Sequence, residues 1–306
     1  MTRGRVLPSD STVLSGFFNA IFFVMLSSFL SAQSRDTMSA RPSQVERVKL
    51  WTMFENMPKN WNAWGKNIFR SEHAEEWAWV GGLTLLTFAT DDDTYTPADK
   101  FYKSSDDTRY WSDFFAEIGD GRTQFAVAGA FAAYGLAFDD NKAFNTGSQI
   151  VQAVFASGAV IQVLKHVTGR ESPFVRTTPT GVWNFFPNQV DYHRFVPHYD
   201  AFPSGHICTS LATVIIIAEN YPDNKWVKPV GYTLTTLVGL GMLNNGIHWI
   251  SDYPLGLFIG YYFGKLAAHP EGYDWGGTDG GNARMKMSIL PTITPSGGGL
   301  MMSVRF

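Results

Sequence analysis

Apolar residues gather in six stretches along the chain, and short polar connections separate these stretches. Within each stretch the apolar positions favour helices rather than alternating strands. Six such segments in one chain predict a helical bundle, and therefore an all-α fold. The predicted helices cover residues 76–89, 123–138, 145–166, 205–219, 227–244 and 252–268.

Acidic and turn-forming residues mark the connections between the predicted helices. Three acidic groups, Asp91-Asp92-Asp93, Asp120-Gly121 and Asp139-Asp140-Asn141, lie next to apolar stretches, and Tyr221-Pro222-Asp223-Asn224 is a turn signal. Carboxylates in such positions cap helices or close turns, although they are also the ligands that calcium prefers. We adopt the capping and turn interpretation.

The first 34 residues differ in character from the rest of the chain. Arg3 and Arg5 precede the apolar residues 16–30, and small residues follow in Ser31-Ala32-Gln33-Ser34. This order is typical of a signal peptide, cleaved after Ala32 or Ser34, or of an uncleaved N-terminal anchor. Either interpretation predicts export, with the protein periplasmic or membrane-associated and its active site outside the cytoplasm.

Three further regions follow the leader. Residues 35–109 are polar with scattered tryptophans at their start and are expected to form a helical lead-in, while residues 110–270 carry most of the apolar stretches and are expected to form the core. The tail, residues 271–306, is rich in glycine. Around Pro295-Ser296-Gly297-Gly298-Gly299 its pattern predicts a short β-hairpin.

Composition removes several classes of protein. With 45% hydrophobic residues, the chain of 306 residues can build a sizeable core. A formal net charge of −3 without a basic run argues against nucleic-acid binding. One cysteine, Cys208, allows neither an intramolecular disulfide nor a multi-cysteine zinc site, and we expect it to be a small buried side chain.

The apolar runs also bear on the membrane. Uninterrupted runs reach roughly a dozen residues, whereas a spanning helix needs about 20. A soluble or peripherally attached helical domain is therefore our preferred interpretation. A compact integral membrane domain stays open, because residues 125–138 and 231–242 are rich in the small residues that pack membrane helices.

The first group with potential chemistry is Pro203-Ser204-Gly205-His206, directly before the apolar run 207–218. Ser204 occupies the position of a helix N-cap. The first N–H groups of a helix are free and carry the positive end of its dipole, so Ser204 and Gly205 offer a cradle for an anion. His206 would lie beside that anion. By itself, the group also fits a capped helix with an incidental histidine.

The second group contains His248 and Asp252. If the stretch between them is helical, the two side chains lie on one face, and a carboxylate on one ring nitrogen makes the other nitrogen a better base or nucleophile. Pro254 allows a different interpretation, in which a new helix begins here and Asp252 caps it. A purely structural His–Asp pair is equally compatible with the spacing.

The third group ends a long apolar stretch and contains Lys165, Gly169, Arg170 and Pro173. Pro173 takes the chain out of the helix. Lys165 could reach a phosphate as a flexible point charge, and the alternative is that the cations only complement the helix dipole.

The three groups together resemble the three-part signature of the type-2 phosphatidic acid phosphatase (PAP2) superfamily, which includes bacterial acid phosphatases and vanadium haloperoxidases. In that family a lysine is followed after six residues by Arg-Pro, then by Pro-Ser-Gly-His, and then by Ser-Arg, five residues, His, three residues and Asp. The match covers about residues 110–268. The matching positions are Lys165 and Pro173, then Pro203 to His206, and finally His248 and Asp252.

The chain resembles a divergent member, because two arginines of the signature are replaced. Ser172 stands at the first position, and Gly241-Met242 stands where the family has Ser-Arg. In the family both arginines hold phosphate oxygens. Each such hydrogen bond is worth roughly 1.5–3 kcal/mol, so losing two costs about 3–6 kcal/mol, or roughly a hundred- to ten-thousand-fold in transition-state binding. We expect Arg170 to replace them in part.

The resemblance implies a PAP2-like phosphoric ester hydrolase that acts on phosphomonoesters or diphosphates, of lipids or other amphipathic molecules, at a membrane surface. His248 is the expected nucleophile, Asp252 orients it, and His206 is the expected acid and base. No metal or cofactor is expected, and the oligomeric state is left open. The residues expected to bind the substrate phosphate are Lys165, Ser204, Gly205 and Arg170.

Three alternatives belong beside this expectation. The first alternative is a catalytically weakened or non-catalytic relative that binds phosphate, because the two arginines are missing. A vanadium-dependent haloperoxidase uses the same cradle but also relies on the arginines, and it ranks lower. A purely structural envelope protein disagrees with the intact second motif and with the His–Asp pair of the third.

Overall fold

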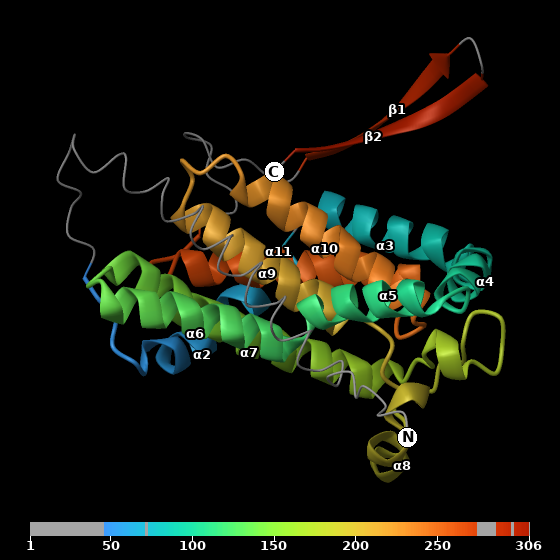
Figure 1. Cartoon of the computed structure of the whole chain (residues 1–306), viewed down its shortest axis with the longest axis horizontal. Helices are drawn as coiled ribbons and strands as arrows, with labels where there is room; N and C mark the ends of the chain where they lie inside the picture. The colour runs from blue at the N-terminus through green and yellow to red at the C-terminus, as the bar shows by residue number, and fades with distance from the viewer. Residues whose placement is uncertain (1–45, 71–72, 274–285, 295–296, 306) are drawn as a thin grey trace, which may run out of the picture. The chain divides into compact units, whose positions relative to one another are not determined.

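The apolar stretches of the chain fold into helices that lie side by side (Figure 1). The computed structural model describes residues 46–70, 73–273, 286–294 and 297–305, so the expected leader at residues 1–34 lies outside the described residues. The fold is all-α apart from the tail, as the sequence pattern predicts. The helices are α2 (Thr52–Asn67), α3 (Ala74–Phe88), α4 (Asp91–Tyr102), α5 (Asp106–Gly119), α6 (Gly121–Ala137), α7 (Asn141–Thr168), α8 (Gln189–Arg194), α9 (Gly205–Asn220), α10 (Val227–Asn244) and α11 (Tyr253–Ala268).

Helix α9 lies at the centre of the arrangement. Its most extensive contacts are with α11, and it also packs against α7 and α10. Two further pairs, α6 with α7 and α5 with α10, widen the bundle on either side. Helix α9 begins at Gly205, directly after its N-cap Ser204. The predicted anion cradle therefore lies at the start of the central helix.

Glycines on α11 allow it to approach α9 closely. A Cβ atom added at Gly256 would lie 2.6 Å from the carbonyl oxygen of Ser204, and one added at Gly260 would meet the carbonyl oxygen of Cys208. Any larger residue would therefore push the helices apart. This contact holds the beginning of α9 against the beginning of α11.

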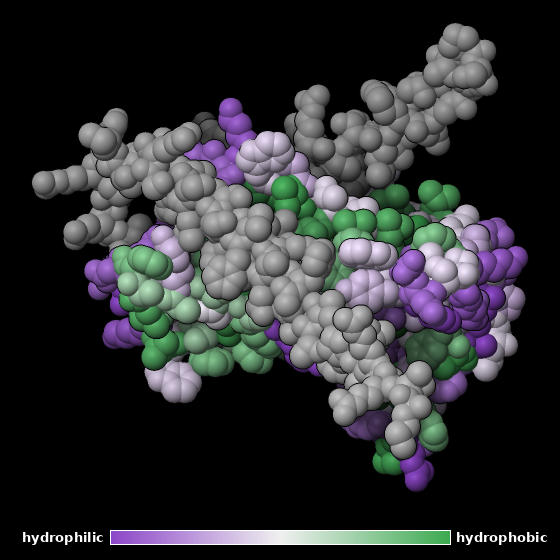
Figure 2. Space-filling model, in the orientation of Figure 1, coloured by the Kyte–Doolittle hydropathy of each residue, from purple (hydrophilic) through white to green (hydrophobic). Residues whose placement is uncertain are grey.

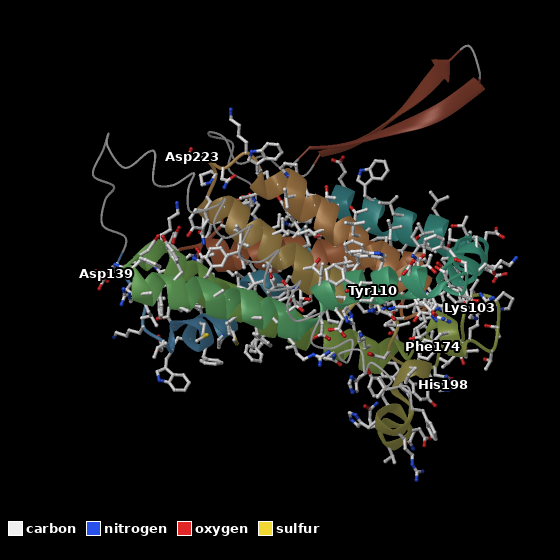
Figure 3. The ribbon with its side chains drawn as sticks, in the orientation of Figure 1. Lys103, Tyr110, Asp139, Phe174, His198 and Asp223 are labelled. Carbon is white, nitrogen blue, oxygen red and sulfur yellow. The ribbon has the colours of Figure 1, made fainter. Side chains whose placement is uncertain are left out.

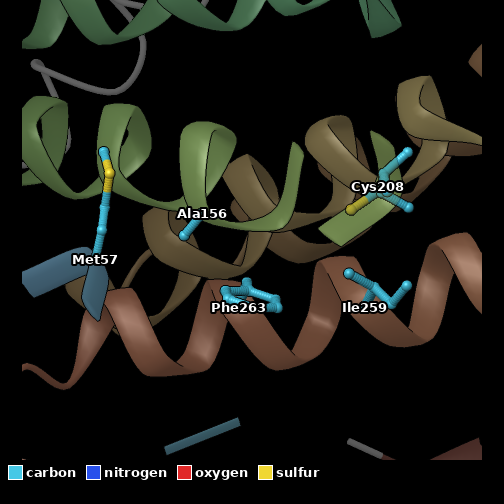
Figure 4. Close-up of a cluster of buried hydrophobic side chains, with 6 residues drawn as sticks. Met57, Ala156, Cys208, Ile259 and Phe263 are labelled. Carbon is cyan, nitrogen blue, oxygen red and sulfur yellow. The ribbon is translucent and has the colours of Figure 1, made fainter. Parts of the chain in front are cut away.

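A cluster of buried apolar side chains ties four helices together (Figure 4). Cys208 is fully buried in it, in agreement with its expected role as a small hydrophobe. The cluster comes from α2, α7, α9 and α11, which fixes these helices around the centre of the bundle. Its members are Met57, Ala156, Ile161, Cys208, Ile259 and Phe263.

The expected caps are found at two of the three acidic groups. Asp120 accepts a hydrogen bond from the backbone N–H of Arg122 and caps α6, and Asp140 accepts one from Ala143 and caps α7. At the third group α3 ends at Phe88, as the predicted segment requires, but Asp91 caps no helix. It is the first residue of α4, whose N-cap is Thr90, and its side chain is buried.

The end of α7 fits its sequence. Gly169 adopts the left-handed conformation, with φ of 52°, and its N–H donates to the carbonyl oxygen of Lys165. This is the conformation that glycine favours at helix ends. The chain then leaves the helix through a long connection, residues 169–204, which contains α8 and two short 3₁₀ turns, Pro173–Val175 and Val196–His198. Figure 3 shows Phe174 and His198 on this connection.

One helix of the described residues, α7, is long and apolar enough to cross a membrane by length and composition, and 44% of its most apolar window is buried inside the bundle. Figure 2 shows hydrophobic surface on the visible face of the helices.

In the tail, strands β1 (Lys286–Thr294) and β2 (Gly297–Arg305) form the expected antiparallel hairpin, with Lys286 opposite Arg305 and Thr294 opposite Gly297.

Candidate active site

The fold brings the three sequence groups together. Lys165 comes from the last turns of α7, His206 from the first turn of α9, and His248 from the segment between α10 and α11. The rings of His206 and His248 lie 5.8 Å apart between centroids and are inclined at 67°. Two imidazoles from distant parts of the chain therefore face the beginning of one helix.

The surroundings of His248 determine which of its nitrogens carries the proton. Its Nδ1 lies 2.7 Å from the carbonyl oxygen of Ala201 and 3.5 Å from Oδ2 of Asp252. Both partners can only accept, so Nδ1 must be the donor and Nε2 keeps its lone pair. Nε2 is buried and has no hydrogen-bond partner among the residues that the structure describes. A nitrogen in this state is poised to act as a nucleophile or a base.

Asp252 is held by three contacts in a fully buried position. It accepts from the backbone N–H of Trp249 at 2.8 Å and from the guanidinium of Arg170 at 2.5 Å, in addition to its approach to His248. The stretch Ile250–Asp252 is a 3₁₀ turn and α11 begins at Tyr253, so a new helix does begin here. Asp252 occupies the N-cap position without capping through its side chain.

Arg170 joins Asp252 to a second buried carboxylate. Its other terminal nitrogen lies 2.5 Å from Oδ2 of Asp91, a residue of α4. Ser251 links the same groups, because its hydroxyl accepts from Arg170 at 2.7 Å and donates to Asp91 at 2.6 Å. Arg170, Asp91, Asp252 and Ser251 are all fully buried, and a guanidinium in such a place requires these anionic partners.

The expected phosphate-binding role of Arg170 does not fit this arrangement. Both of its terminal nitrogens are engaged by protein groups, and its carbon lies 4.8 Å from the ring centre of Trp183 and 5.2 Å from that of Trp249. Aromatic rings around the guanidinium add cation–π attraction and exclude water. Arg170 therefore supports Asp252 from behind instead of replacing a phosphate-binding arginine.

Lys165 also has a partner that the motifs did not indicate. Its ammonium lies 2.9 Å from Oδ1 of Asp200, and its side chain is 6% exposed against 28% for Asp200. The hydroxyl of Tyr192, on α8, donates to the same carboxylate at 3.1 Å. From the sequence alone Asp200 was one of several polar residues of a long connection, with no signal that distinguished it.

The beginning of α9 has the geometry of the predicted cradle. The Ser204 hydroxyl oxygen accepts from the backbone N–H of Ile207 at 3.4 Å, and the Ser204 N–H donates to the carbonyl oxygen of Asp252 at 3.0 Å. Helix starts leave their first N–H groups without intrahelical partners. Gly205 is the first residue of α9, so its backbone N–H is one of these groups and lies between the Ser204 cap and His206 in the chain.

His206 faces a carboxylate from another helix. Its Nε2 lies 3.9 Å from Oδ2 of Asp120, and its side chain is 29% exposed, which makes it the more accessible of the two histidines. Although burial acts in the opposite direction, hydrogen bonds from Arg122 lower the pKa of Asp120 below its usual value. An ionised carboxylate therefore lies beside the expected acid and base.

Both histidines are neutral in the resting site. Removal from water, together with His248 and Lys165, lowers the pKa of His206 to about 3. Burial, followed by the charge of Lys165, lowers the pKa of His248 to about 3. Burial raises the pKa of Asp252 to about 6 while Arg170 opposes it, so Asp252 is ionised at neutral pH. The result is a neutral imidazole at His248, supported by the carboxylate of Asp252.

The two positions that lack the signature arginines are occupied by buried residues. Met242 is fully buried in a cluster with Ala116, Ile207 and Val238, and its carbonyl oxygen accepts from the N–H of His248 at 3.3 Å. Ser172 is 3% exposed.

No group of three or more His, Cys, Asp or Glu residues in the described part of the chain is arranged to hold a metal ion.

Two histidines, a lysine and a helix N-terminus therefore come together within one helical bundle. Residues 147–273, less than half of the chain, match the family model of the PAP2 superfamily. Lipid A 1-phosphatase of Porphyromonas gingivalis is 28% identical over 85 residues, which cover 25% of this chain and 19% of that relative. The chain thus spans about a fifth of the length of the curated relative it matches.

A solved structure is also similar. The transmembrane PAP2 type phosphatidylglycerolphosphate phosphatase from Bacillus subtilis aligns with 65% of this chain and 94% of its own length, at a TM-score of 0.47 and 15% identity.

Proposed function

We propose that this protein is a phosphatase that hydrolyses phosphomonoesters or diphosphates of lipids or other amphipathic molecules through a phosphohistidine on His248. The observation that carries the proposal is the orientation of this histidine. Its Nδ1–H donates a hydrogen bond to the Ala201 carbonyl oxygen, and the lone pair of its Nε2, beside His206, has no partner among the described residues. The match of residues 147–273 to the PAP2 superfamily model supports the same chemistry.

The first step transfers the phosphoryl group to the protein. Nε2 of His248 attacks phosphorus, the bond from phosphorus to the leaving oxygen breaks, and His206 gives that oxygen a proton. His206 is neutral at rest, and the negative charge of a bound phosphate raises its pKa so that it can carry this proton. Asp252 balances the positive charge that develops on the ring of His248.

The second step releases phosphate. His206, now neutral, takes a proton from a water molecule, the hydroxide oxygen attacks phosphorus, and the bond from phosphorus to His248 breaks. Lys165, the Ser204 hydroxyl and the Gly205 N–H hold the phosphate oxygens in both steps and stabilise their charge.

Two observations support an amphipathic substrate at a membrane surface. The similar protein from Porphyromonas gingivalis is named as a phosphatase of lipid A. The connection that carries Asp200 also exposes large apolar side chains, and such exposure favours contact with lipid. They are Phe174, Phe185, Phe186, Val190, Phe195 and Val196. We place the site outside the cytoplasm, in line with the expected leader.

The test is hydrolysis of a phosphorylated lipid and of a soluble phosphomonoester by purified protein. His248→Ala and His206→Ala protein should lose turnover, with phosphate release falling to the blank for His248→Ala. His269→Gln is the matched control, since His269 pairs with Glu219 at the other end of α11 and should leave the rate unchanged. Retained turnover in His248→Ala protein removes His248 from the mechanism.

Met242 favours a second candidate, a relative that binds phosphate without turnover. Its side chain lies in the apolar core, so no arginine reaches the phosphate from this position. This candidate predicts that vanadate and phosphate bind, that His248→Ala changes only the affinity, and that no phosphoester is consumed. Halide oxidation in the presence of vanadate would instead indicate haloperoxidase chemistry.

A further inference from the structure

The expected phosphate-binding lysine is already paired with an anion. Its ammonium lies 2.9 Å from Oδ1 of Asp200, in a position where the lysine is almost fully buried. An ammonium has three N–H donors, so Lys165 can hold Asp200 and a phosphate oxygen together. The phosphate would then lie close to a carboxylate of the same sign.

The carboxylate of Asp200 is fixed in place from two sides. Tyr192 donates to it at 3.1 Å, and the Tyr192 ring stacks on His166 of α7 at 3.9 Å between centroids. The backbone of Asp200 forms a bridge with that of Arg170, and the next residue, Ala201, donates its N–H to the Arg170 carbonyl oxygen at 2.9 Å. Phosphate binding therefore cannot simply turn the carboxylate away.

The charges around the site do not favour an anion as strongly as the motif suggests. Arg170 is matched by both Asp91 and Asp252, and Asp120 lies beside His206. Asp200 acts on both histidines through its charge, in addition to offsetting Lys165. At the two positions where the family signature has arginine, this chain has Ser172 and Met242.

We propose that Asp200 is a specificity-determining residue that weakens the hold of the site on the phosphate group itself. Free inorganic phosphate then binds poorly and leaves after hydrolysis, and a substrate is retained mainly through its organic part. The class of substrate is a phosphate ester of a large apolar alcohol, not a small phosphate compound. This inference rests on the proposed function for its role in catalysis, whereas its effect on anion binding can be measured without turnover.

The experiment compares inorganic phosphate binding by wild-type and Asp200→Asn protein, using isothermal titration calorimetry on the full chain. Removing a like charge about one ion-pair length from the phosphate should lower the Kd by about ten- to a hundred-fold. Asp191→Asn is the matched control, because Asp191 lies on α8 in the same connection, whereas the carboxylate that pairs with Lys165 is that of Asp200. Its Kd should equal that of the wild type.

The opposite result is equally clear. If Asp200→Asn protein is folded and binds phosphate as weakly as the wild type, or more weakly, then Asp200 only holds Lys165 in position and the proposal is wrong. Asp200→Ser, which removes the carboxylate with a smaller side chain, gives the same comparison if the asparagine variant does not fold.

Turnover separates this proposal from the proposed function. If both hold, phosphate becomes a stronger inhibitor of hydrolysis in Asp200→Asn protein by the same factor as the change in Kd. Tighter phosphate binding in a protein that never hydrolyses a phosphoester would support the role of Asp200 and contradict the phosphatase activity. If the protein hydrolyses phosphoesters but Asp200→Asn leaves its phosphate affinity unchanged, the phosphatase activity is supported and the proposed role of Asp200 is contradicted.

Discussion

Asp91 and Asp252 bind the two terminal nitrogens of one guanidinium, that of Arg170, and all three side chains are fully buried. Asp91 begins α4 and Asp252 directly precedes α11, so this contact joins the first half of the bundle to the residue that supports His248. A buried network of this kind has little tolerance for the loss of one member, because the remaining charges keep their cost of burial.

Replacing Arg170 by methionine should strongly destabilise the fold. Asp91 and Asp252 would lose their common cation, and breaking a buried ion pair in this way costs about 3–5 kcal/mol of the free energy of unfolding. Urea denaturation followed by circular dichroism measures the change. Arg122→Met is the control, since Arg122 is 80% exposed and its loss should leave the free energy of unfolding almost unchanged. Equal effects of the two substitutions would contradict the role given to Arg170.

His248 should make the stability depend on pH. Its folded pKa of about 3 lies below the ordinary value of about 6.5, so the unfolded chain binds more protons between these values. The stabilisation is complete above about pH 6.5 and is lost as the pH falls toward 3, which amounts to about 2 kcal/mol at pH 5. Asp252, with its raised pKa, acts in the opposite direction.

The comparison with His248→Gln isolates the contribution of the histidine, because Asp252 is present in both proteins. Between pH 7 and pH 5 the wild type should lose about 2 kcal/mol more of its free energy of unfolding than the variant. Denaturant titrations at the two pH values measure this difference. Parallel losses in the two proteins would mean that His248 is not held in its neutral form.

Restoring the signature arginine at position 242 should harm the protein instead of improving it. Met242 is fully buried beside Ala116, Ile207 and Val238, so Met242→Arg places an unpaired charge in an apolar cluster. We expect a loss of about 3–5 kcal/mol. Met242→Leu, which keeps the volume, should cost less than about 1.5 kcal/mol. Stable Met242→Arg protein with stronger vanadate binding would show that this position does reach the phosphate.

The close approach of α9 and α11 can be tested with alanine. Gly260→Ala places a Cβ atom against the Cys208 carbonyl oxygen and should cost about 1–3 kcal/mol. Gly129→Ala, in the middle of α6, meets no atom of the described residues within 4 Å and should stabilise the protein by about 0.5–1 kcal/mol. Thermal denaturation of the two variants should therefore shift in opposite directions.

The helices could be predicted where burial leaves a periodic apolar pattern. The expected segments 205–219 and 227–244 agree closely with α9 and α10. The polar helix α4 falls within the expected helical lead-in, residues 35–109, but its contact with the site was not predicted, because that contact does not show in the spacing of the residues. Asp91 binds Arg170, and Tyr95 packs on Trp249 at 5.6 Å between ring centres.

The candidate site was only partly readable for the same reason. Lys165, His206 and His248 converge as their motifs predict, since the motifs mark residues whose spacing is tied to helix ends. The carboxylates Asp120 and Asp200 gave no such signal, because a single aspartate beside a turn looks the same in sequence whether it lies in water or beside a histidine. Arg170 was misassigned because its buried anionic partner, Asp91, is remote in the chain.

The network around Arg170 also bears on how short a working version of this protein can be. Asp91 and Asp120 both precede residue 147, where the match to the PAP2 superfamily begins. A fragment cut at that boundary would keep every signature residue and yet leave Arg170 with only one of its two counter-ions. For anyone trimming or transplanting this site, ion-pair partners and not the borders of a sequence signature define the smallest self-sufficient piece.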